Sequence, residues 1–363
     1  MSRALSRFSG PAPLPRAFAL VCLILAALNL VGALGGGLLR LGWGALPAPL
    51  AAQALQGHGA LMMAGFFGSL IALERALALR RGMGVPLSAA CAGLLALAGF
   101  WAWAGWLWLL AAVGLLGLYV WAAYSRARSL PLAVEASGAL ALVWAAAAFV
   151  LGAPEQSRWG WSLFLLLTIV GERRELMRLR PLPGWAAQAF LLAWGVLGVA
   201  ALLLMGPAPG LGAPLVWIIM GLLSLWLLAF DLARLQWRSN GWAGHTARCL
   251  LVGYVWLLAA ALAGLWGQGG AGGIAWHLLW LGFVFSMVFA HAPIMLPALA
   301  GLRPRYSPWA LLPLAVMGLS LLLRSTAVLA GHPNALAWAG AGHGVAVLGF
   351  GLIMGRLCSS TSA

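Results

Sequence analysis

The sequence predicts an all-α fold, namely a polytopic transmembrane helix bundle of about 12 spans with both termini in the cytoplasm. The first observation is composition: 64% of the 363 residues are hydrophobic and only 7% are charged. Soluble domains carry about 25% charged and about 45–50% apolar residues. The second is a series of apolar runs of about 20 residues, the length that crosses a bilayer. The third is a one-sided distribution of arginine. Together these observations exclude a soluble enzyme, a disordered chain and a disulfide-stapled scaffold.

Twelve apolar runs can be marked off between turn residues. They cover residues 17–38, 52–75, 86–104, 106–125, 132–152, 158–175, 184–205, 212–233, 247–267, 273–297, 308–330 and 334–356. No connection is long enough for a soluble domain, so we expect residues 16–357 to form a single transmembrane domain. We expect residues 1–15 to form a cytoplasmic tail rather than a signal peptide, because the first run is too long for one. Residues 358–363 are expected to form a short C-terminal tail.

The basic residues alternate with these runs. All 21 are arginine, against six acidic residues, which gives a net charge of +15. When the runs are threaded back and forth across a bilayer, 18 arginines fall on one side, and Arg40, Arg158 and Arg324 fall on the other. The positive-inside rule makes the arginine-rich side the cytoplasm. Topology therefore explains the excess charge, and nucleic acid is not expected as a partner.

Three histidines, His58, His277 and His343, are predicted to lie in the outer half of the membrane on three different helices. Polar residues inside a bilayer are costly, so each is a candidate cofactor-binding residue. Glycine lets a flat ligand approach the backbone closely. Each histidine is followed by a Gly-Phe pair: Gly65-Phe66, Gly282-Phe283 and Gly349-Phe350. Two facing imidazoles are a usual ligand pair for haem iron. Two interpretations stay open, a haem or metal site, and histidines that hydrogen-bond between helices or line a substrate path.

A second candidate site lies further along the helix that carries His277. His291 is 14 residues later, close to the same helix face and near the inner end, in a segment that two prolines interrupt. Thioethers suit Cu(I), so His291, Met62 and Met295 are candidate metal ligands. Methionine is also an ordinary core filler.

Five of the six acidic residues are predicted at cytoplasmic helix ends, several of them beside an arginine. The inner-face ion-pair cluster is expected to comprise Glu74, Arg75, Glu172, Arg173, Asp231 and Arg234. Asp231 and Arg234 are three residues apart and are expected to pair on one helix face. Two interpretations stay open: ion pairs that tie helix ends together, and a proton entry route or anionic-ligand pocket.

Three segments resemble the NnrS-type haem- and copper-containing membrane proteins of denitrifying and related bacteria. Residues 57–66 (Gly-His-Gly-Ala-Leu-Met-Met-Ala-Gly-Phe) look like the family's His-containing second helix. Residues 253–257 (Gly-Tyr-Val-Trp-Leu) look like its Tyr-x-Trp-Leu block. His277, with Gly282 and Met287 after it, looks like the start of its later His helix. The chain is similar, more distantly, to the catalytic subunit of the haem-copper oxidases.

The sequence also departs from both patterns. The family's Gly-His-Thr-Gly-Arg after the later helix is missing, because the chain reads His291-Ala292-Pro293 there. The predicted spans 158–175 and 184–205 contain no histidine, so the copper-binding trio of the oxidases has no counterpart. The resemblance therefore implies a haem-binding scaffold without a dioxygen-reducing centre.

The resemblance implies a membrane haem-binding protein of the bacterial inner (plasma) membrane, with a redox or nitric-oxide-stress role. It implies b-type haem held by His58 and His277, with His343 as the substitute for either, and it leaves copper and an oxidoreductase activity open. The implied surroundings are the lipid bilayer and a membrane redox partner or quinone; the oligomeric state is not specified. Two other functions stay open: a 12-span transporter of a small anion or metal, and an accessory or assembly subunit of a respiratory complex.

Overall fold

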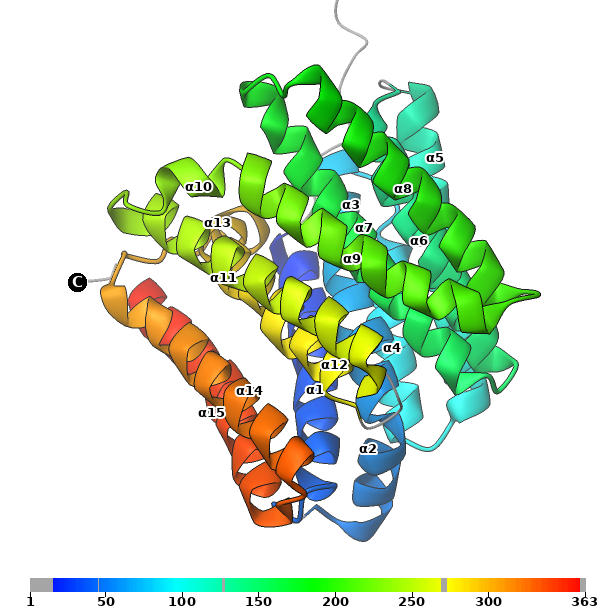
Figure 1. The fold of residues 1–363 in the computed structure, drawn as a ribbon. Helices are drawn as coiled ribbons and strands as arrows, with labels where there is room; N and C mark the ends of the chain where they lie inside the picture. The colour runs from blue at the N-terminus through cyan, green and yellow to red at the C-terminus, as the bar shows by residue number, and fades with distance from the viewer. Residues whose placement is uncertain (1–15, 45, 126–127, 269–272, 360–363) are drawn as a thin grey trace, which may run out of the picture.

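The computed structural model describes residues 16–44, 46–125, 128–268 and 273–359. Within these ranges the regular structure is helical throughout, without a strand (Figure 1). The prediction of an all-α fold is therefore confirmed. Nearly all of these helices are apolar, so they differ mainly in where they end and in which small or polar residues they carry.

The twelve predicted runs correspond to helices or helix series, but the break predicted between runs 86–104 and 106–125 is wrong: it lies at residues 98–100, where Gly99 adopts a positive φ. In chain order the helices are α1 (Arg16–Leu39), α2 (Ala48–Ala60), η1 (Leu61–Gly68), α3 (Ser69–Leu79), α4 (Gly84–Leu97), α5 (Trp101–Ser125), α6 (Leu130–Val150), α7 (Pro154–Leu176), η2 (Met177–Leu179), α8 (Gly184–Met205), α9 (Pro209–Phe230), α10 (Ala233–Gln236), α11 (Gly241–Ala263), η3 (Gly264–Gln268), α12 (Ile274–His277), η4 (Leu278–Val284), α13 (Phe285–Ala300), η5 (Pro308–Leu311), α14 (Leu312–Ala330) and α15 (Pro333–Ser359). Proline occupies the first turn of α2, α6, α7, α9 and α14, where no intrahelical N–H bond is lost. Gly301 and Gly331, both at positive φ, end α13 and α14.

Among the described residues, ten helices or helix series are long and apolar enough to cross a membrane. The chain is therefore a membrane-embedded helical bundle. The other two predicted runs coincide with α4, an apolar helix of 14 residues, and α7, which has charged residues near both ends. The count of twelve spans and the orientation of the termini stay predictions.

The start of α1 and the end of α15 lie toward the same end of the bundle (Figure 1). The Arg305 backbone N–H donates to the Leu357 carbonyl at 3.1 Å, and a Cβ on Gly301 would lie 3.7 Å from the Arg16 guanidinium carbon. We call this the inner end, after the predicted topology, and the opposite end the outer end. α15 runs to Ser359, two residues into the predicted tail; the rest of that tail and residues 1–15 lie outside the described residues.

The α14–α15 hairpin, orange to red in Figure 1, stands beside the rest of the bundle. Its two helices pack mainly on each other, and they meet the remaining helices chiefly at α1, α12 and η4. A hairpin attached along so few elements leaves space on the side that faces the bundle, and this space becomes the cavity described below.

Three π-helical stretches occur among the described residues: η3 ends the helix that begins with α11, and η1 and η4 each lie inside a longer helix. α2, η1 and α3 form one continuous helix, as do α12, η4 and α13. In each, the hydroxyl of a serine at the end of the stretch bonds a carbonyl four residues earlier: Ser69 to Gly65 and Ser286 to Gly282. π-Helical turns occur frequently at functional sites, and here η1 and η4 each begin shortly after a candidate histidine.

Candidate functional site

A cavity of about 520 Å³ lies in the outer half of the bundle, between the α14–α15 hairpin and α1, α2, η1, α7, α12 and η4. All three candidate histidines line it: His58 from α2, His277 from α12 and His343 from α15. The structure therefore brings together three side chains that are far apart in the sequence. The volume is in the usual range for small-molecule and cofactor sites, about 300–1,000 Å³.

His58 lies in the last turn of α2, half-buried, just before the π-helical stretch η1. Its Nδ1 is 2.6 Å from the Ala33 carbonyl oxygen on α1. A carbonyl can only accept, so Nδ1 carries the proton and Nε2 keeps its lone pair. The ring also packs on Gly37, where a Cβ would lie 2.8 Å from His58 Cε1. The α1 backbone thus fixes both the tautomer and the place of this imidazole.

His277 ends α12, just before the π-helical stretch η4. Its Nδ1 is 3.4 Å from the Gly273 carbonyl oxygen, a weak contact that again leaves Nε2 without a hydrogen bond among the described residues. Phe66 of η1 stacks on Phe285 of α13, with ring centroids 6.4 Å apart. Each of these phenylalanines is eight residues after its histidine, about 12 Å along a helix. The two phenylalanines are in contact, and both helices run from the histidine toward the inner end. His58 and His277 therefore lie at matching depths in the bundle.

His343 is the most enclosed of the three, with 6% of its surface exposed. Its Nδ1 is 2.7 Å from the Ser320 hydroxyl of α14, and that hydroxyl donates to the Met317 carbonyl at 2.9 Å. The serine oxygen therefore accepts from the Nδ1 proton, and Nε2 is buried without a hydrogen-bond partner. A buried lone pair without a donor is costly, which marks Nε2 as a place for a metal or a donor.

The three histidines share one pattern: Nδ1 is held by an oxygen of the protein and Nε2 has no partner among the described residues. Metal-ligating histidines almost always donate their other ring N–H in this way. The Gly-Phe pairs do not supply the close approach that the sequence suggested, because Gly65, Gly282 and Gly349 do not line the cavity. A Cβ on Gly65 would meet Asn29 and one on Gly282 would meet Trp256, so these two glycines allow helix packing instead, whereas Gly349 has no neighbour within 4 Å.

Three arginines line the same cavity: Arg40, Arg158 and Arg324. They are the three that the charge count placed on the outer side of the membrane. The sequence places these three arginines on the same side of the membrane as the three histidines, but it does not indicate that they share a cavity with them.

The candidate metal ligands are divided between the two ends. Met62 lines the cavity beside Met63, whereas His291 and Met295 do not line it. His291 donates from Nδ1 to the Met287 carbonyl at 2.8 Å, and its electrostatic neighbours are the inner-end residues Arg173 and Asp231. No three His, Cys, Asp or Glu side chains of the described residues gather closely enough to hold one ion. Copper binding stays a prediction.

At the inner end, Asp231 forms a fully buried ion pair with Arg173. Arg173 Nε and Nη2 each donate at 2.8 Å to a different carboxylate oxygen, and Tyr254 Oη and the Ala233 N–H donate at 3.0 Å and 2.7 Å. The predicted pair with Arg234 is wrong. α9 ends at Phe230, so Asp231 is extended and does not share a helix face with Arg234, whose guanidinium bonds the Ala229 carbonyl instead.

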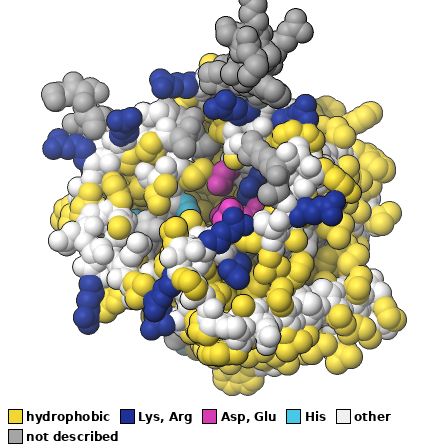
Figure 2. All heavy atoms as spheres, turned by 90° about the horizontal axis from the view of Figure 1, so that it is seen from above, with side chains coloured by type: hydrophobic (Ala, Val, Ile, Leu, Met, Phe, Trp, Pro, Cys, Tyr) yellow, Lys and Arg dark blue, Asp and Glu magenta, His cyan; other side chains and the backbone are white. Residues whose placement is uncertain are grey.

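A second ion pair joins Arg75 of α3 to Glu135 of α6, with Nη2 and Oε2 2.6 Å apart. The Arg75 guanidinium lies 4.8 Å from the centre of the Tyr119 ring, and its charge also interacts with Glu74 and Glu172. Of the predicted members, only Arg173 and Asp231 form an ion pair with each other; Arg75 pairs with Glu135, which was not among them, and Arg234 forms no pair with Asp231. Figure 2 shows this end of the molecule, with the carboxylates near its middle and arginines around them.

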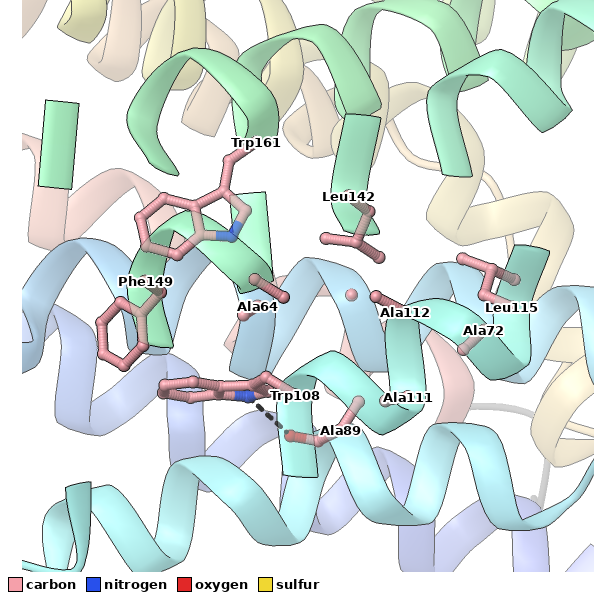
Figure 3. A pocket seen from close by; sticks show the side chains of 12 residues that line it. Ala64, Ala72, Ala89, Trp108, Ala111, Ala112, Leu115, Leu142, Phe149 and Trp161 are labelled. Carbon is pink, nitrogen blue, oxygen red and sulfur yellow. Dashed lines mark hydrogen bonds between the residues drawn. The ribbon is translucent and has the colours of Figure 1, made fainter. Parts of the chain in front are cut away.

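A second, much smaller void of about 10 Å³ lies between η1, α3, α4, α5, α6 and α7. Figure 3 shows that alanines, leucines and aromatic rings line it, and that Trp108 Nε1 donates to the Ala89 carbonyl, at 3.1 Å. A space of this size holds about one water molecule and this one is apolar, so we assign it to packing.

Comparison with known proteins places the chain in a family. No curated protein and no solved structure matches it. A family model described as "Domain of unknown function (DUF8744)" matches residues 19–357. Because this match contains both the cavity and the inner-end ion pairs, and nearly the whole chain, the chain belongs to the DUF8744 family.

Proposed function

We propose that this protein is a membrane haem-binding protein, and that His58 and His277 would hold the haem in its cavity. The observation that carries the proposal is the convergence of three histidines, each with Nδ1 engaged and Nε2 free, on one cavity of about 520 Å³. The matching depth of His58 and His277 favours these two as the pair. His343 lines the cavity on the α15 side, and we propose it as the alternative ligand in place of either His58 or His277.

The residues present fit such a group. A Cβ on Gly59, which lines the cavity, would meet nothing within 4 Å, so the backbone there is open to a flat ring. The aromatic rings of Trp280, Trp161 and Phe285 supply apolar walls that exclude water. Trp280 is itself held by a hydrogen bond to Ser162 Oγ at 3.0 Å.

A bound haem supplies one-electron transfer or the binding of a small gas such as nitric oxide. The chain's own contribution is to orient two imidazoles through the Ala33 and Gly273 carbonyls and to keep the site dry. The proposal includes b-type haem, a redox or nitric-oxide-related role in a bacterial inner membrane, and a membrane redox partner or quinone. Copper at Met62 and Met63 is an optional addition, since thioethers suit Cu(I).

The test is the optical spectrum of the full chain, expressed with a haem precursor and purified in detergent. We expect a Soret band that His58→Ala and His277→Ala alter. His332→Ala is the matched control, because His332 is exposed and does not line the cavity. An altered band in the control alone, or equal bands in all variants, would contradict the assignment of the ligands.

A transporter of a small anion is the second candidate, because three arginines line the same cavity. Purified protein in liposomes that takes up an anion without any redox partner would favour this function. If His58→Ala takes up the anion as fast as the wild type, transport does not depend on haem bound by His58.

A further inference from the structure

Arg324 is a buried cation without a counter-charge among the described residues. It lies on α14, lines the cavity and has 8% of its surface exposed. Its Nε is buried without a hydrogen-bond partner, and no ion pair joins it to a carboxylate of the described chain. A buried charge normally has a partner, because removal from water is costly. Arg324 therefore points to an anion that the chain does not itself provide.

The acidic residues of this protein cannot fill that role. Five of the six belong to the inner end, where arginines already hold Asp231 and Glu135. The sixth, Glu155, is exposed at the outer start of α7 and interacts with Arg158. No Asp or Glu lines the cavity. The counter-charge for Arg324 must come from a ligand.

The other two cavity arginines are held in place around the same space. The Arg158 guanidinium lies 5.5 Å from the centre of the Trp276 ring, and both residues line the cavity. Arg40 donates from Nε to the Leu55 carbonyl at 3.1 Å. These two are more exposed than Arg324, so they stand nearer the mouth of the cavity.

We infer that the ligand of this cavity carries carboxylate groups, and that Arg324 is the residue that selects for them. This inference rests on the proposed function and deepens it: the ligand class is a macrocycle with carboxylate side chains, at least one of which would pair with Arg324. A guanidinium presents a planar fork that matches a carboxylate. The cavity is far larger than a small inorganic ion, which favours a charged group on a large ligand.

The experiment compares two probes on the full chain, purified in detergent without haem: protohaem, and its dimethyl ester, which has the same ring without the negative charges. Each is titrated into the wild type, Arg324→Gln, Arg324→Lys and the control Arg238→Gln, whose arginine is exposed at the inner end. We expect the wild type to bind protohaem at least tenfold more tightly than the ester. We expect Arg324→Gln to lose this preference, Arg324→Lys to keep part of it, and Arg238→Gln to keep all of it.

Equal affinity of the wild type for protohaem and for the ester would overturn the inference and leave haem binding intact. This comparison uses only the wild type, so it does not depend on whether a variant folds. Binding of neither probe would refute the proposed function itself.

Discussion

Gly37→Ala tests the candidate site without replacing any of the three cavity histidines. A Cβ on Gly37 would lie 2.8 Å from His58 Cε1 and 3.0 Å from Nδ1. Ordinary van der Waals contact begins at 3.4 Å, so the ring must move by about 0.6 Å or turn. Either change disturbs the 2.6 Å hydrogen bond between Nδ1 and the Ala33 carbonyl. Loss of such an orienting bond typically costs about 10–100-fold in metal affinity, or about 1.4–2.7 kcal/mol.

The assay is a haem titration followed by the Soret band, with Gly35→Ala as the matched control. Gly35 lies on the same turn of α1, and a Cβ there would make an ordinary 3.5 Å contact with Leu46. Both substitutions replace glycine by a better helix former, which favours α1 by about 1 kcal/mol, so neither should unfold the protein. Gly36→Ala supplies the misfolding reference, because its Cβ would overlap the Ala54 carbonyl. Equal haem affinity of Gly37→Ala and Gly35→Ala would refute the role given to His58.

Two further predictions concern stability in detergent, measured by thermal unfolding. Ser320→Ala leaves the Nδ1 proton of the third cavity histidine buried without an acceptor and should cost about 1–3 kcal/mol. Ser325→Ala, on the same helix, removes only a bond to its own helix and should cost less; equal losses would contradict the assigned hydrogen bond. Asp231→Ala leaves Arg173 buried and unpaired and should cost about 3–5 kcal/mol. Arg234→Ala should change the free energy of unfolding by no more than about 0.5 kcal/mol. A loss as large as that of Asp231→Ala would indicate that Asp231 pairs with Arg234 after all, which would contradict the structure.

The depth of the three cavity histidines could be predicted from the sequence. Counting along a helix needs only the helix ends, and turn residues mark these ends clearly. The rotation of each helix and the bonds of His58 to Ala33 and His343 to Ser320 could not be predicted, because they depend on which helices pack together. The same counting places Arg158 and Arg324 on the side of the histidines, but only the packing of the helices shows that they line the same cavity.

Two local predictions failed for backbone reasons. The expected pairing of Asp231 with Arg234 assumed a helix that continues past Phe230, whereas α9 ends there. The Gly-Phe pairs at Gly65 and Gly282 lie within π-helical stretches. Their glycines serve packing against neighbouring helices, and a sequence pattern alone does not separate that use of glycine from close approach by a ligand.

Haem binding through His58 and His277 is tested by the haem content and the low-temperature electron paramagnetic resonance spectrum of the full chain, purified after haem-replete expression. We expect about one haem per chain with the low-spin ferric signal of two imidazole ligands, and we expect His58→Ala and His277→Ala each to lose that signal. A chain that purifies folded but without haem, or a signal that both variants retain, would contradict haem binding through these two residues.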